Sequence, residues 1–73
     1  MDVKKEDKSE QSKKDHIVYY KSLSKIITEL KEERRQESEP TIQRHLDGRI
    51  GAMEQDRKRI RNMFPDVLED EWN

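Results

Sequence analysis

Apolar residues recur at helical spacing in two stretches of the chain, and a turn-like segment separates these stretches. The first stripe consists of Tyr19, Tyr20, Leu23, Ile26, Ile27 and Leu30. The second stripe consists of Ile42, Leu46, Ile50, Met53, Ile60 and Phe64. Ser38, Glu39 and Pro40 lie between them, and so short a connection makes successive helices antiparallel neighbours. The pattern predicts an all-α fold, an antiparallel two-helix hairpin at about residues 13–37 and 40–64.

Residues at the ends of the two stretches predict where each helix begins and ends. Ser12 and Asp15 match the helix-start pattern in which a serine oxygen accepts a hydrogen bond from a free backbone amide. Arg34 and Arg35 place positive charge near the end of the first helix, where the helix dipole favours it. Pro40 suits the first turn of the second helix, because its missing amide hydrogen has no partner to lose there.

Two glycines interrupt the second apolar stretch and leave its continuity open. The stripe passes Gly48 and Gly51 without losing its spacing, which favours one continuous helix. The alternative is a break, because Leu46-Asp47-Gly48 also resembles a helix end. In that case two shorter helices would replace the second one.

The apolar stripes also predict contact with a second copy of the chain. The chain has 73 residues, of which 29% are hydrophobic and 45% charged, and it has no cysteine for a disulfide. A domain of this size builds only a small core, and two helices alone leave the back of each stripe uncovered. We therefore expect a homodimer that completes a four-helix bundle. The predicted self-association core is Tyr20, Leu23, Ile27, Leu30, Leu46, Ile50, Met53, Ile60 and Phe64.

Pairing the helices about residue 38 predicts which side chains face each other. Leu23 is then opposite Met53, and Tyr20 is opposite Asp56 or Arg57. An arginine at this level has two options. Its guanidinium stacks on the tyrosine ring, or its stem lies along the helix and the charge extends into water.

Residues 1–12 form a charged segment with one apolar side chain after Met1. Ordering such a segment costs conformational entropy with little burial to offset it, which predicts a disordered tail. The alternative is an arm that becomes ordered on a partner. No apolar run is long enough to span a membrane, and the start does not resemble a signal peptide. We expect a soluble, cytoplasmic protein that does not contact membranes, and the lack of cysteine fits that compartment.

The C-terminal segment, residues 65–73, is acidic and carries three large apolar side chains. Its acids follow a basic block at residues 57–61, although the whole chain has a net charge of only −1. We favour a tail that folds back on the hairpin, since a small chain rarely leaves a tryptophan exposed without using it. The alternative is a docking segment for a protein partner. The docking residues would be Val67, Leu68 and Trp72.

Basic residues of the second helix suggest a weaker alternative, contact with nucleic-acid phosphates. The candidates are Arg44, Arg57, Lys58, Arg59 and Arg61. A nucleic-acid interface is normally a coherent basic stripe. On a helical wheel these residues spread over a wide arc and alternate with Asp47, Glu54 and Asp56, which argues against such an interface.

No motif predicts catalysis, a cofactor or a metal site. His16 and His45 have no second ligand at helical spacing, and the sequence shows no base for Ser22 or Ser24. We therefore expect no enzyme but a small helical interaction protein, an adaptor, regulator or inhibitor. It would act by self-association and by binding another macromolecule, in the first place a protein. A third hypothesis, a chain largely unfolded until bound, follows from its high charge.

Overall fold

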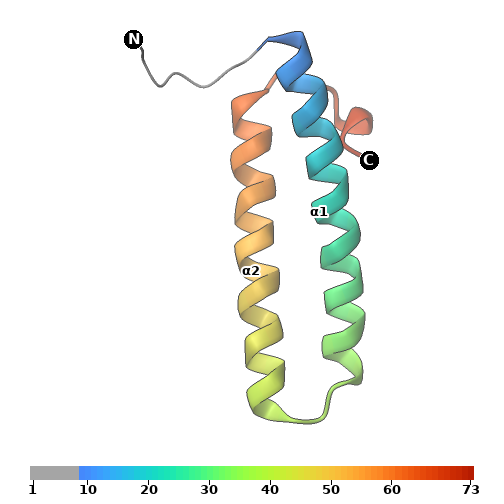
Figure 1. Cartoon of the computed structure of the whole chain (residues 1–73), viewed down its shortest axis with the longest axis vertical. Helices are drawn as coiled ribbons and strands as arrows, with labels where there is room; N and C mark the ends of the chain where they lie inside the picture. Colours follow the sequence, from blue (N-terminus) through green and yellow to red (C-terminus); the bar gives the residue numbers. More distant parts are fainter. Residues whose placement is uncertain (1–8) are drawn as a thin grey trace.

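The computed structural model describes residues 9–73. Two long helices, α1 (Glu10–Gln36) and α2 (Pro40–Met63), are followed by a short 3₁₀ helix, η1 (Glu69–Glu71). Figure 1 shows α1 and α2 side by side and antiparallel, with the connection at one end and η1 near the other. The predicted all-α hairpin is confirmed for this part of the chain. The disorder predicted for residues 1–8 concerns residues outside the described range.

Helix α1 begins earlier than predicted, because a different serine caps it. The Ser9 side chain accepts a hydrogen bond from the Ser12 amide at 3.2 Å, so Ser9 is the N-cap and the assignment to Ser12 is wrong. Residues 10–12, predicted to belong to the disordered tail, are helical. Ser12 instead lies in the first turn, where it is buried and contacts Nδ1 of His16.

The connection between the helices is short and extended. Glu37 and Glu39 both have extended backbone angles, and Pro40 occupies the first turn of α2 as predicted. The amide of Gln43 donates to the Glu39 carbonyl, which begins the hydrogen-bonding pattern of α2. Helix α2 then continues through Gly48 and Gly51 without a break. The favoured interpretation of the second stretch is therefore confirmed.

The predicted pairing of the helices is seen at Tyr20 and Leu23. The Arg57 guanidinium lies over the Tyr20 ring, and Met53 packs against the cluster that contains Leu23. Tyr20 also accepts a hydrogen bond from Arg61, and Ser24 accepts one from Arg57. Asp47 pairs with Arg34 in the last turns of α1. Ile42, in the first turn of α2, stays 43% exposed.

The core consists of two apolar clusters along the hairpin, bridged by the half-buried Met53. The cluster near the connection contains Ile27, Leu30, Leu46 and Ile50. The cluster at the other end contains Tyr20, Leu23, Ile60, Met63, Phe64, Val67 and Trp72. We call this second end of the molecule the tail end, because residues 64–73 return to it and supply part of its core.

Candidate interaction surface

The predicted self-association core is buried within a single chain. Eight of its nine residues are buried, and Met53 is half-buried. The expectation that the hairpin leaves the back of both stripes uncovered is therefore wrong for these nine residues, whereas the stripe members Tyr19 and Ile42 are exposed. The two helices cover each other near the connection, and the C-terminal tail covers them at the tail end. A contact with a second copy would need other residues, so dimerisation stays a prediction.

The C-terminal tail folds back on the hairpin, as the favoured interpretation expected. The Trp72 side chain is only 2% exposed, and its ring lies 4.6 Å from the ring of Tyr20. Val67 is buried in the same cluster. Leu68 is not covered when the tail folds back, because its side chain is 65% exposed. Of the three candidate docking residues, only Leu68 offers an accessible apolar side chain in this conformation.

Ion pairs hold the tail at two points. The Lys13 ammonium lies 2.7 Å from the Asp66 carboxylate, and Arg61 pairs with Glu69. The hydrogen bond from Lys13 lowers the pKa of Asp66, and the same bond raises the pKa of Lys13. The two carboxylates are exposed and the two cations are half-buried, and ion pairs near the surface stabilise a protein only modestly. They fix the path of the tail, and the buried apolar side chains supply most of its stabilisation.

Tyr20 contacts both the tail and the basic block of α2. The guanidinium of Arg57 lies 5.4 Å from the centre of its ring, and that of Arg61 lies 5.9 Å away. Arg57 also donates to the Ser24 hydroxyl at 2.9 Å, which fixes its position. Of the two options for Arg57, the structure shows stacking on the tyrosine. Attraction between a cation and an aromatic face therefore adds to apolar burial here.

The five predicted phosphate-contacting residues do not form one patch. Arg44 is exposed in the second turn of α2, far along the helix from the other four. Arg59 pairs with Asp56, and Arg61 pairs with Glu69. Arg57 and Lys58 have no carboxylate partner among residues 9–73. These two line an open depression together with Tyr20, Glu54, Arg61 and Asn62.

Three exposed apolar side chains belong to the half of the hairpin that ends at the tail end. Val18 and Leu68 are 66% and 65% exposed, and Tyr19 is 46% exposed. Val18 is not part of the predicted stripe. Tyr19 is part of it, and its exposure differs from the burial that the stripe predicts. Ile42, at the opposite end, is the remaining large apolar residue of this kind in the described range.

The described residues offer few groups with reactive or ligating geometry. No group of three histidine, cysteine or carboxylate side chains among residues 9–73 is arranged to hold a metal ion. Nδ1 of His16 lies 2.8 Å from the Ser12 carbonyl, and its ring packs 5.2 Å from Phe64. No helix in that range is long and apolar enough to cross a membrane.

One core residue was missed in the sequence. Met63 is buried, although the predicted stripe omitted it. Its position three residues after Ile60 places it on the same helix face, and that spacing was the available signal. His16 shares the spacing of the first stripe, and its ring packs on Phe64. Both residues extend the packing at the tail end.

Comparison with known proteins adds no family to this description. No protein-family model matches the chain, and no curated protein or solved structure matches it.

Proposed function

We propose that this chain is a non-enzymatic helical interaction protein, an adaptor, regulator or inhibitor that binds other protein chains through its tail end. One observation carries the proposal. The apolar core is closed within the chain, yet Val18, Tyr19 and Leu68 remain exposed at one end of the hairpin. Single exposed apolar residues are common on protein surfaces, whereas several at one end favour a contact site.

Leu68 is the most informative of these three residues. It lies between the buried Val67 and the 3₁₀ helix, on a tail held by Lys13 and Arg61. Its backbone position is therefore largely fixed before any partner binds. A fixed apolar side chain loses less conformational entropy on binding than one on a mobile segment. This arrangement supports recognition by a folded hairpin over the hypothesis of a chain that folds only on binding.

A second copy of the chain is the first partner that we propose. Closed two-fold dimers are the commonest assemblies of soluble proteins. This dimer would use surface residues of the tail end, because the nine predicted core residues are already covered. The large exposed apolar side chains at this end are only Val18, Tyr19 and Leu68 within residues 9–73, so we expect a weak and reversible dimer.

Sedimentation equilibrium tests this proposal. The wild-type protein should reach about twice its monomer mass at tens of micromolar, because dimerisation follows mass action. Leu68→Ser should shift the equilibrium toward monomer, since it removes an exposed apolar contact without disturbing the core. Ile42→Ser is the matched control, because Ile42 is also exposed but lies at the opposite end. A wild type that stays monomeric, or two variants with equal effects, would contradict the proposed surface.

Nucleic-acid binding remains the alternative, with weaker support. Arg59 and Arg61 are engaged by Asp56 and Glu69, and Arg44 lies apart from them. Phosphate contacts at these positions would have to compete with carboxylates of the same chain.

A further inference from the structure

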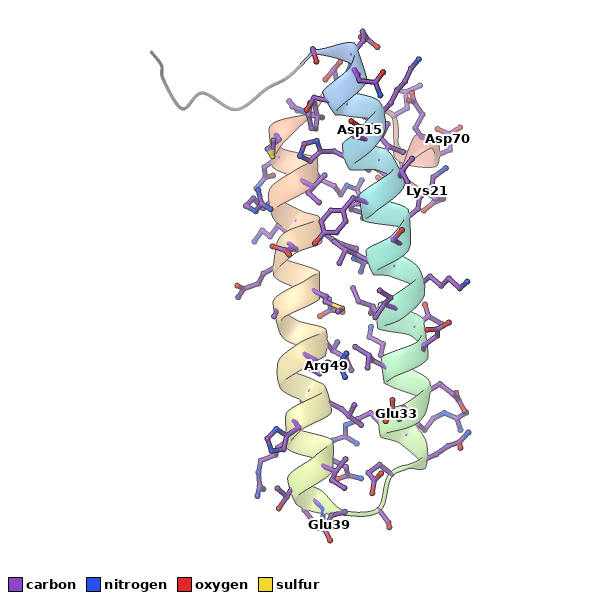
Figure 2. The ribbon with its side chains drawn as sticks, viewed as in Figure 1. Asp15, Lys21, Glu33, Glu39, Arg49 and Asp70 are labelled. Carbon is purple, nitrogen blue, oxygen red and sulfur yellow. The ribbon has the colours of Figure 1, made fainter. Side chains whose placement is uncertain are left out.

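A depression lies where side chains of α1 and α2 meet, and most of the residues that line it are polar. Figure 2 shows side chains of both helices in the space between them. From α1, Tyr20 lines the depression. The residues of α2 follow one another at the spacing of a single helix face, and three of the five are cations. They are Glu54, Arg57, Lys58, Arg61 and Asn62.

Two of these cations are fixed by the same tyrosine. The Arg57 and Arg61 guanidiniums lie 5.4 and 5.9 Å from the centre of the Tyr20 ring. Arg57 also donates to the Ser24 hydroxyl, and Arg61 donates to the Tyr20 hydroxyl. A guanidinium carries five N–H groups, so these bonds leave further donors on both side chains. Donors that the fold already holds in place lose less conformational entropy when a ligand binds.

The two carboxylates next to the depression are already engaged. Glu54 lies 3.2 Å from the Lys31 ammonium of α1, and Glu69 pairs with Arg61. The other two cations of the depression share one turn of α2, and no carboxylate of residues 9–73 pairs with them. Neighbouring like charges repel each other, and a bound anion relieves that repulsion.

We propose that this depression binds one phosphate group, as inorganic phosphate or as a phosphomonoester. A phosphomonoester carries about 1.5 to 2 negative charges at neutral pH and three strong acceptor oxygens. It therefore matches the two unneutralised cations, and arginine donors suit its oxygens. A carboxylate carries one charge and two oxygens, so it matches them less well. The inference goes beyond the proposed function, because it does not depend on the contact at the tail end.

A single phosphate group fits the depression better than a nucleic-acid strand does. A strand presents phosphates at regular intervals and requires a continuous row of cations. The adjacent Arg59 is engaged by Asp56, and Arg44 lies several turns away on α2. The basic residues of α2 therefore form one local site and not a track.

Titration with sodium phosphate at constant ionic strength, followed by heteronuclear NMR, tests the inference. The guanidinium signals of Arg57 and Arg61 and the side-chain amide signal of Asn62 should shift and saturate. Acetate, the carboxylate probe, should bind more weakly. O-phosphoserine is the second phosphate probe. Tighter binding of O-phosphoserine than of inorganic phosphate would support the site with a phosphomonoester as its ligand, and the reverse would support it with free phosphate.

Substitutions in the depression should change the affinity in opposite directions. Lys58→Gln should weaken phosphate binding roughly fivefold, because it removes one exposed charge from the site. Glu54→Gln should strengthen binding roughly twofold or more, since it removes a bordering negative charge and releases Lys31. A gain in affinity cannot result from unfolding. Arg44→Gln is the control, because it removes the same charge from a distant turn of α2 and should leave the affinity unchanged.

Saturable shifts that weaken in Lys58→Gln but not in Arg44→Gln support the inference, with circular dichroism to verify folding. Shifts that do not saturate, that acetate reproduces equally, or that both variants reduce alike would overturn it. Binding of an oligonucleotide without binding of either phosphate probe would also overturn it, in favour of a nucleic-acid interface. A protein that binds phosphate but stays monomeric would contradict the proposed dimer and leave this inference standing.

Discussion

Replacing Trp72 by alanine should lower the free energy of unfolding by about 3–5 kcal/mol, the usual cost of removing a large buried aromatic side chain. Trp72 lies outside both long helices, in the segment that returns to the hairpin. Here it is 2% exposed and packs on Tyr20, with the Arg61 guanidinium 5.9 Å from its ring. Small domains are stable by only about 5–15 kcal/mol, so the loss should be visible as a large drop in melting temperature.

Leu68→Ala is the control for the Trp72 substitution. It removes an apolar side chain from the same tail, but Leu68 is exposed and should contribute little to folding. Thermal unfolding followed by circular dichroism at one low protein concentration measures both variants without a contribution from dimers. Equal and small losses for the two variants would show that the tail does not pack as described.

Replacing Leu23 by aspartate should unfold the hairpin. Leu23 is 4% exposed and belongs to the cluster that includes Ile60 and Trp72. An aspartate there places an unpaired carboxylate in an apolar site, which costs several kcal/mol beyond the lost packing. A sum of that size is comparable to the whole stability of a small domain. Helical signal in circular dichroism should therefore fall strongly at room temperature.

Two other aspartate substitutions calibrate this prediction. Val18→Asp lies on the same helix but on its exposed side, so the helical signal should stay close to wild type. Met53→Asp should be intermediate, because Met53 is half-buried between the two clusters. Similar losses for Leu23→Asp and Val18→Asp would mean that the packed face of α1 is assigned incorrectly.

Helical periodicity was sufficient to predict both helices and their antiparallel arrangement. The apolar spacing of the second stretch also predicted a helix that continues through Gly48 and Gly51. Neither glycine has a positive φ angle, and a Cβ at either position would meet no atom within 4 Å. The helix-end pattern at Asp47-Gly48 therefore does not correspond to a break in α2. Periodic burial over many residues outweighs one weak helix-end pattern.

The start of α1 was harder to predict. Only Ser12 is followed three residues later by an acid, so the pattern selects Ser12, whereas Ser9 caps the helix in the structure. The choice of Ser9 adds a turn to α1 and brings Lys13 within reach of Asp66.

The burial of the stripes was predicted incorrectly because a helical wheel treats each helix alone. It identifies the residues that share a face, but it does not show what the returning tail covers. Val67 and Trp72 fill the tail end, so the hairpin needs no second copy for its core. The accessible apolar side chains at this end are therefore Val18, Tyr19 and Leu68, outside the predicted core.

The C-terminal tail is part of the hairpin core, and the fluorescence of Trp72 reports on this packing. Trp72 is the only tryptophan in the chain, so its emission reports this site alone. We predict blue-shifted emission from the isolated protein at low concentration, because the Trp72 side chain is buried against Tyr20. On unfolding in denaturant, the emission should move to that of tryptophan in water. Water-like emission from the folded protein, shifting only when a partner is added, would contradict the account and support the docking interpretation.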